Sequence, residues 1–130
     1  MPAGIRLRFL GTRGEIEPRS RRHHWHTALL VECRQVRIML DCGVDWLHRI
    51  ARLCPSAIVL THAHLDHAGG LAAGAPCPVY ATSETWSRID RYPLIERHII
   101  ETDRSFRLGS VAWQAVALEH SLRAPRWVFA

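Results

Sequence analysis

The chain has 130 residues, 48% of them hydrophobic, which is enough to bury one core and too little for several domains. No stretch approaches the roughly 18–20 apolar residues that a membrane-spanning helix requires. The N-terminus lacks the hydrophobic region of a signal peptide. We therefore expect a cytoplasmic chain that forms one domain over residues 1–130 and does not associate with a membrane.

The formal net charge is +5, and all 17 basic residues are Arg. Arg binds phosphate well, so a nucleic-acid partner is one interpretation. The complete absence of Lys points first to a GC-rich genome, which favours Arg codons. The densest basic run, residues 19–24, lies in a loop that is either simply solvated or attracts a phosphate-bearing substrate. His24 and His26 are more simply interpreted as ordinary loop residues than as metal ligands.

Hydrophobic patterning and turn residues predict a mixture of strands and helices. In chain order, we expect strands near residues 5–10, 27–33, 36–41, 57–61, 78–81 and 111–119. Helices are expected near residues 44–53, 66–73, 83–90 and 93–100. The four Cys residues show no Cys-x-x-Cys spacing and lie in or beside apolar segments, so we expect buried thiols.

The most informative segment is residues 61–70, Thr-His-Ala-His-Leu-Asp-His-Ala-Gly-Gly. It carries four side chains that can bind zinc, iron or manganese, namely His62, His64, Asp66 and His67. The first two follow an apolar strand at a spacing of two, so their imidazoles face the same way in extended chain. The other two fit the start of a short helix. Ligands from both elements suit two neighbouring ions better than one; a His-rich surface loop is the alternative.

Residues 62–67 resemble the His-x-His-x-Asp-His signature of the metallo-β-lactamase-fold hydrolases. Three flanking elements extend this resemblance from about residue 5 to about residue 125, and they are Phe9–Gly14, Leu40–Gly43 and Glu119–Ser121. The Leu-Gly-Thr opening is similar to that of the ribonuclease Z-like and phosphodiesterase-like branches. The resemblance implies an α/β fold, the N-terminal half of the αββα sandwich, with a mixed sheet flanked by helices.

The same resemblance implies roles for individual residues. His62, His64 and His120 would hold a first metal ion, and Asp66 and His67 would contribute to a second. Asp41 would lie under the site and orient the ligands through hydrogen bonds. The alternative interpretation is that Asp41 is an ordinary polar residue at the end of a strand. The implied cofactor is Zn²⁺, one or two ions, with Mn²⁺ or iron as alternatives. Asp66 is also the candidate catalytic residue, because it would guide a proton.

The implied function is a metal-dependent hydrolase in which a metal-activated water attacks a phosphodiester, either a small molecule or a nucleotide. Nucleic acid is a less favoured substrate, and the sequence gives no oligomeric state. No Asp or His follows His120, whereas the family continues with further metal ligands. A truncated, inactive metal-binding fragment, incomplete at its C-terminus, is therefore the alternative. If CGG encodes Arg126, one base inserted before this codon shifts the reading frame to a sequence that resembles the continuation of the family. We therefore hypothesise a single-base deletion near codon 126, which the nucleotide sequence would test.

Overall fold

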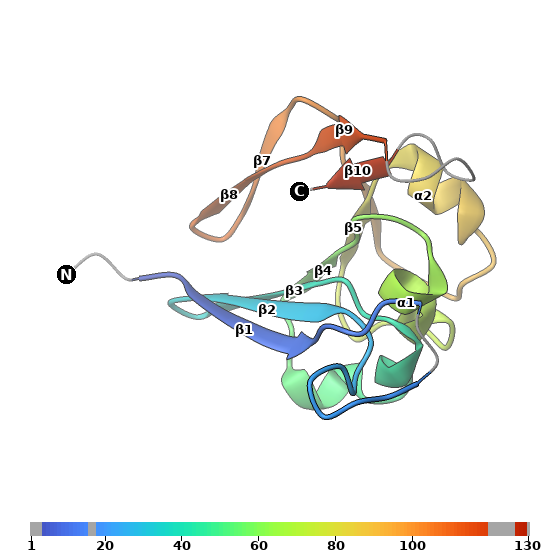
Figure 1. Ribbon diagram of the computed structural model, residues 1–130. Helices are drawn as coiled ribbons and strands as arrows, with labels where there is room; N and C mark the ends of the chain where they lie inside the picture. Colours follow the sequence, from blue (N-terminus) through green and yellow to red (C-terminus); the bar gives the residue numbers. More distant parts are fainter. Residues whose placement is uncertain (1–3, 16–17, 120–126, 130) are drawn as a thin grey trace.

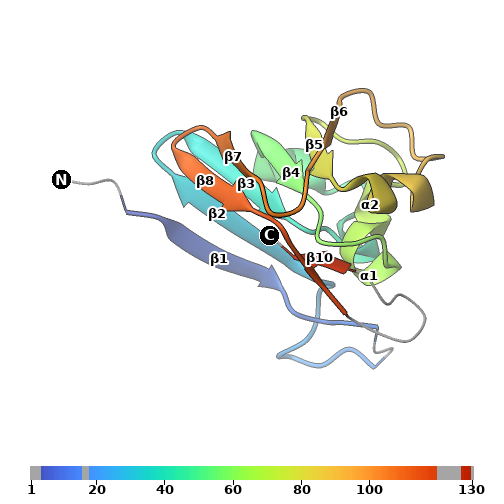
Figure 2. The same cartoon turned by 90° about the horizontal axis from the view of Figure 1, so that it is seen from above.

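A six-stranded mixed sheet forms the centre of the computed structural model, which describes residues 4–15, 18–119 and 127–129. The strands follow chain order across the sheet, and they are β1 (Arg6–Gly11), β2 (Ala28–Cys33), β3 (Val36–Leu40), β4 (Ala57–Val59), β5 (Val79–Ala81) and β6 (Arg97–Ile99). Strands β1 to β3 pair antiparallel, and β3 to β6 pair parallel. Figure 2 shows β1 as the outermost of the antiparallel strands.

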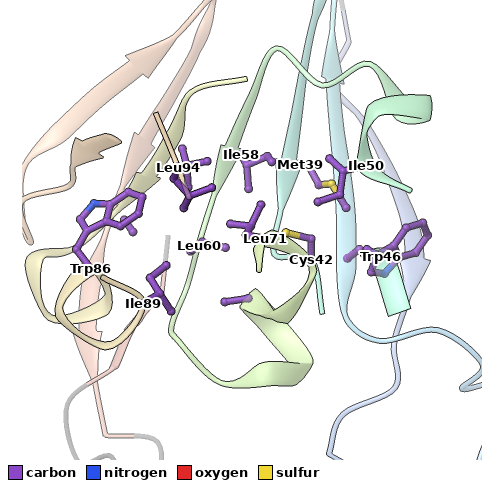
Figure 3. Close-up of a cluster of buried hydrophobic side chains, with 14 of the residues drawn as sticks. Met39, Cys42, Trp46, Ile50, Ile58, Leu60, Leu71, Trp86, Ile89 and Leu94 are labelled. Carbon is purple, nitrogen blue, oxygen red and sulfur yellow. The ribbon is translucent and has the colours of Figure 1, made fainter. Parts of the chain in front are cut away.

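One face of the sheet is covered by short helical segments, which are η1 (Val44–Trp46), η2 (Ile50–Leu53), α1 (Leu65–Ala68), η3 (Gly69–Leu71) and α2 (Ser83–Arg88). Between these segments and the strands lies the main core, drawn in Figure 3, in which Met39, Ile58 and Leu71 are completely buried. Trp46 and Trp86 close its two ends (Figure 3). Burial of this apolar surface is what holds the short helices on the sheet.

The opposite face carries the hairpin of β7 (Ser105–Leu108) and β8 (Val111–Gln114) (Figure 1). A second, smaller core fills the space between them and includes Val31, Ile38 and Leu108. Two further strands, β9 (Val116–Leu118) and β10 (Trp127–Phe129), pair antiparallel nearby. At the sheet edge, Leu7 and Phe9 face the same side as this core, yet they remain 53% and 71% exposed.

Most predicted elements are confirmed, with four differences. The helix expected over residues 93–100 is wrong, because this β-branched segment extends the sheet as β6. The helix expected over 44–53 forms two 3₁₀ segments, since Leu47 has a non-helical ψ of 130° and His48 has a positive φ of 61°. The strand expected over 111–119 is divided into β8 and β9, and β7 was not anticipated.

The parallel pairing of β3 with β4 places their carboxyl ends side by side. The loops that follow the two strands, residues 41–43 and 60–64, therefore meet at one edge of the sheet. This edge is where side chains from distant parts of an α/β sheet converge. Within the described residues, no helix is long and apolar enough to cross a membrane.

Candidate metal centre

Asp41 turns the chain sharply at the end of β3. Its backbone is in the left-handed region, with φ of 59°, which Asp tolerates better than most residues. Its N–H donates to the Val59 carbonyl at 2.9 Å, so the turn is fixed against the neighbouring strand. Asp41 is only 3% exposed. Its side chain reaches the loop that follows β4.

Thr61 links the Asp41 carboxylate to His62. The Thr61 N–H donates to Asp41 Oδ1 at 2.8 Å, and its hydroxyl donates to Oδ2 at 2.6 Å. A hydroxyl has a single proton, so the same Thr61 oxygen accepts from His62 Nδ1, which lies 2.8 Å away. This chain of hydrogen bonds puts the His62 proton on Nδ1 and the lone pair on Nε2.

His67 lies between two carboxylates. Its Nδ1 donates to Asp41 Oδ2 at 2.7 Å, and its Nε2 is 3.2 Å from Asp66 Oδ2. Burial lowers the pKa of His67, but the hydrogen bonds to Asp41 and Asp66 outweigh burial and raise it to about 9. Burial raises the pKa of Asp66, and the hydrogen bond and charge of His67 bring it below its usual value. The two carboxylates thus favour a positive charge at the position of His67.

Three imidazoles of the motif gather at this point. The His62 ring centroid is 4.0 Å from that of His67 and 5.0 Å from that of His64. One ligand atom each from Asp41, His62 and His67 lies within 4.8 Å of the others. Sequence reasoning placed Asp41 beneath the ligands, and here it contacts His67 directly. His120 lies outside the described residues, so its role as a ligand stays a prediction.

These residues fit a divalent cation. Thr61 and Asp41 engage the Nδ1 atoms of His62 and His67, so Nε2 is the ring atom of each that could bind an ion, as in carboxylate-oriented metal ligands. Asp41 and Asp66 both contact His67, so two negative charges converge where a cation would bind. Neutral imidazole and carboxylate are the donor types that zinc prefers.

A cavity of about 500 Å³ opens beside this cluster. His64 and Asp66 line it from the motif, and Glu15 and His26 line it from the loop that precedes β2. Sequence reasoning missed Glu15 and His26 as cavity residues. The only feature of the sequence that could have pointed to them is the histidine-rich run beside His26. Neither Glu15 nor His26 has a fixed spacing to the metal motif of residues 62–67.

Asp45 holds the loop that carries these two residues. Its carboxylate accepts from Arg13 at 2.8 Å, from Arg19 at 2.7 Å and from the His26 N–H at 2.9 Å. The Asp45 side chain is 6% exposed and that of Arg13 is 4% exposed, so this ion pair is shielded from water. Burial raises the pKa of Asp45, but the Arg13 and His26 hydrogen bonds outweigh it and lower the pKa.

Comparison with known proteins gives a consistent result. The model of the β-lactamase superfamily domain matches residues 36–128, more than half of the chain. Ribonuclease Z of Bradyrhizobium diazoefficiens is 41% identical over 70 residues, which cover 50% of this chain and 22% of that protein. Ribonuclease Z of Methanopyrus kandleri is 36% identical over 70 residues, covering 50% of this chain and 24% of that protein. The aligned segment thus spans about a quarter of either curated relative.

Two solved structures share the fold. The metallo-β-lactamase fold protein YhfI of Bacillus subtilis superposes with a TM-score of 0.72 and 12% identity, over 95% of this chain and 55% of that one. A diphosphatase of the PhnP family superposes with a TM-score of 0.65 and 19% identity, over 82% of this chain and 49% of that one. The expected half-sandwich fold is confirmed. The chain has the metallo-β-lactamase fold, and on the family match it belongs to the β-lactamase superfamily domain family.

Proposed function

We propose that this chain binds one or two divalent cations, zinc in the first place, and hydrolyses phosphodiesters. The observation that carries the proposal is the convergence of Asp41, His62 and His67 within 4.8 Å, next to a cavity lined by His64 and Asp66. The relatives named ribonuclease Z and the PhnP-family diphosphatase support a phosphoester substrate over a β-lactam. The fold by itself does not determine which of these substrates is hydrolysed.

In this proposal His62, His64 and His120 hold one ion, and Asp66 and His67 contribute to a second. When bound, such a cation supplies Lewis acidity at the phosphoryl group and lowers the pKa of a coordinated water. Asp41 keeps His67 oriented through the hydrogen bond to Nδ1, and Thr61 does the same for His62. Asp66 lines the cavity, which supports a role for it in taking and releasing a proton during the reaction.

Metal stoichiometry on the purified chain, followed by turnover of bis(4-nitrophenyl) phosphate, tests this function. We expect bound zinc and measurable hydrolysis, both reduced strongly by His64→Ala. His48→Ala is the matched control, because His48 is exposed and borders a different cavity. One ion or none per chain would exclude a two-metal mechanism. Zinc binding without any turnover would instead indicate the inactive metal-binding fragment that the sequence leaves as the alternative.

A further inference from the structure

His26 lies outside the metal motif, yet it lines the same cavity as His64 and Asp66. Gly43 brings it there, because a Cβ placed on Gly43 would lie 2.3 Å from both the His26 Cβ and the Asp66 carbonyl oxygen. Only a glycine allows the loop before β2 to approach the start of α1 this closely. The His26 side chain is 14% exposed, so its ring is largely enclosed at the cavity wall.

The ring orientation of His26 is determined by Asp45. The backbone N–H of Asp45 donates to His26 Nδ1 at 3.1 Å. A backbone N–H is always a donor, so this contact makes Nδ1 the acceptor and places the proton of a neutral ring on Nε2. The Asp45 carboxylate also lies 3.1 Å from Nδ1, but it already accepts from the His26 N–H and from Arg13.

The charges around His26 favour its neutral form. Burial lowers the pKa of His26 and, with the Arg13 and Arg19 cations, outweighs the opposite influence of Asp45 and Asp66. A neutral ring has one N–H, and among the described residues both ring contacts of His26 are made by Nδ1 and none by Nε2. Within the part of the chain that the structure describes, this donor has no partner, so it is available to a ligand in the cavity.

We propose that His26 Nε2–H is a substrate-binding donor, which hydrogen-bonds a nonbridging phosphate oxygen in the cavity beside His64 and Asp66. This inference rests on the proposed phosphodiester substrate and adds to it a residue outside the metal motif. Glu15 and Asp66, the two carboxylates at the cavity, would repel an anion by themselves. Bound cations offset that repulsion, and a fixed donor then selects the oxyanion and stabilises charge that develops on it.

Two substitutions of His26 distinguish the role of the Nε2–H donor from that of the hydrogen bond between the Asp45 amide and Nδ1. The Asn side chain of His26→Asn retains an acceptor for the Asp45 amide near the position of Nδ1, but it has no donor that reaches the cavity. The longer side chain of His26→Gln carries an amide donor near the position of Nε2. The control is His48→Asn, which makes the same change at an exposed residue whose left-handed backbone suits Asn.

The experiment is ring ¹⁵N NMR of the zinc-equilibrated chain, with inorganic phosphate as the probe. We expect the His26 proton on Nε2, a phosphate-dependent shift of that nitrogen, and phosphate affinity about tenfold weaker in His26→Asn. His26→Gln should recover part of the affinity, and His48→Asn should match the parent. In any hydrolysis assay, kcat/KM should fall about 100-fold in His26→Asn.

A proton on Nδ1, a His26 signal that ignores phosphate, or unchanged phosphate affinity in His26→Asn would each overturn the assignment. Zinc content is measured on the same samples, so the two proposals fail separately. A chain without zinc would sink the proposed hydrolase, while the His26 tautomer, which needs no bound cation, would still support or overturn the donor assignment.

Discussion

Replacing Asp41 with Asn removes a negative charge that connects the loop after β3 to the metal motif. The parent carboxylate accepts three hydrogen bonds, two from Thr61 and one from His67. The Asn oxygen can keep the bond from the Thr61 N–H. Its NH₂ group, however, faces two donors that need an acceptor, so the charge-assisted bond from His67 is lost. Such a bond contributes about 1.5–3 kcal/mol, and we expect a stability loss of that size.

The assay is urea unfolding of the chelator-treated chain, in which the midpoint should fall while the m-value stays constant. Asp103→Asn is the matched control, because Asp103 is exposed and shares the left-handed backbone, with φ of 61°. It should change stability by no more than about 0.5 kcal/mol. If Asp41→Asn were equally harmless, the carboxylate would not hold the two loops together, and our reasoning about the site would be wrong.

The same variant should alter the pH dependence of stability. The pKa of His67 is about 9 in the folded chain, against an ordinary value of 6.5. The folded state therefore binds the proton more tightly than the unfolded chain. Its contribution is complete below pH 6.5 and is lost as the pH rises through about 9. Without the Asp41 charge, this loss between the two values should become shallower in unfolding measurements on metal-free protein.

Three further outcomes are expected. Thr61→Val removes the hydroxyl between Asp41 and His62, so zinc affinity measured by chelator competition should drop about 10- to 100-fold; an unchanged affinity would contradict the hydrogen-bond chain. Gly43→Ala puts a Cβ 2.3 Å from the Asp66 carbonyl and should cost about 1–3 kcal/mol in chemical unfolding, whereas Gly4→Ala, with open space around it, should not. Chelation should lower the melting temperature of the zinc-loaded chain, and a constant melting temperature would count against zinc binding to the folded state.

The family and the fold class could be predicted from sequence because the evidence is local. The spacing of residues 62–67 and the apolar runs before and after them are properties of a few consecutive residues. The parallel strand β6 was mistaken for a helix for the converse reason. Residues 97–99 become a strand because β5 offers them a partner, and pairing is a long-range contact that no local pattern encodes.

The cluster of His62, His64, Asp66 and His67 is visible in the sequence alone, because all four lie within six residues. The residues that surround this cluster depend on how the chain folds. Asp41 reaches His67 because β3 and β4 are parallel neighbours, and His26 reaches the cavity because Gly43 lets two loops meet. Residues brought together by strand pairing and close backbone approach have no fixed separation along the chain. Their chemistry is therefore visible only once the chain has folded.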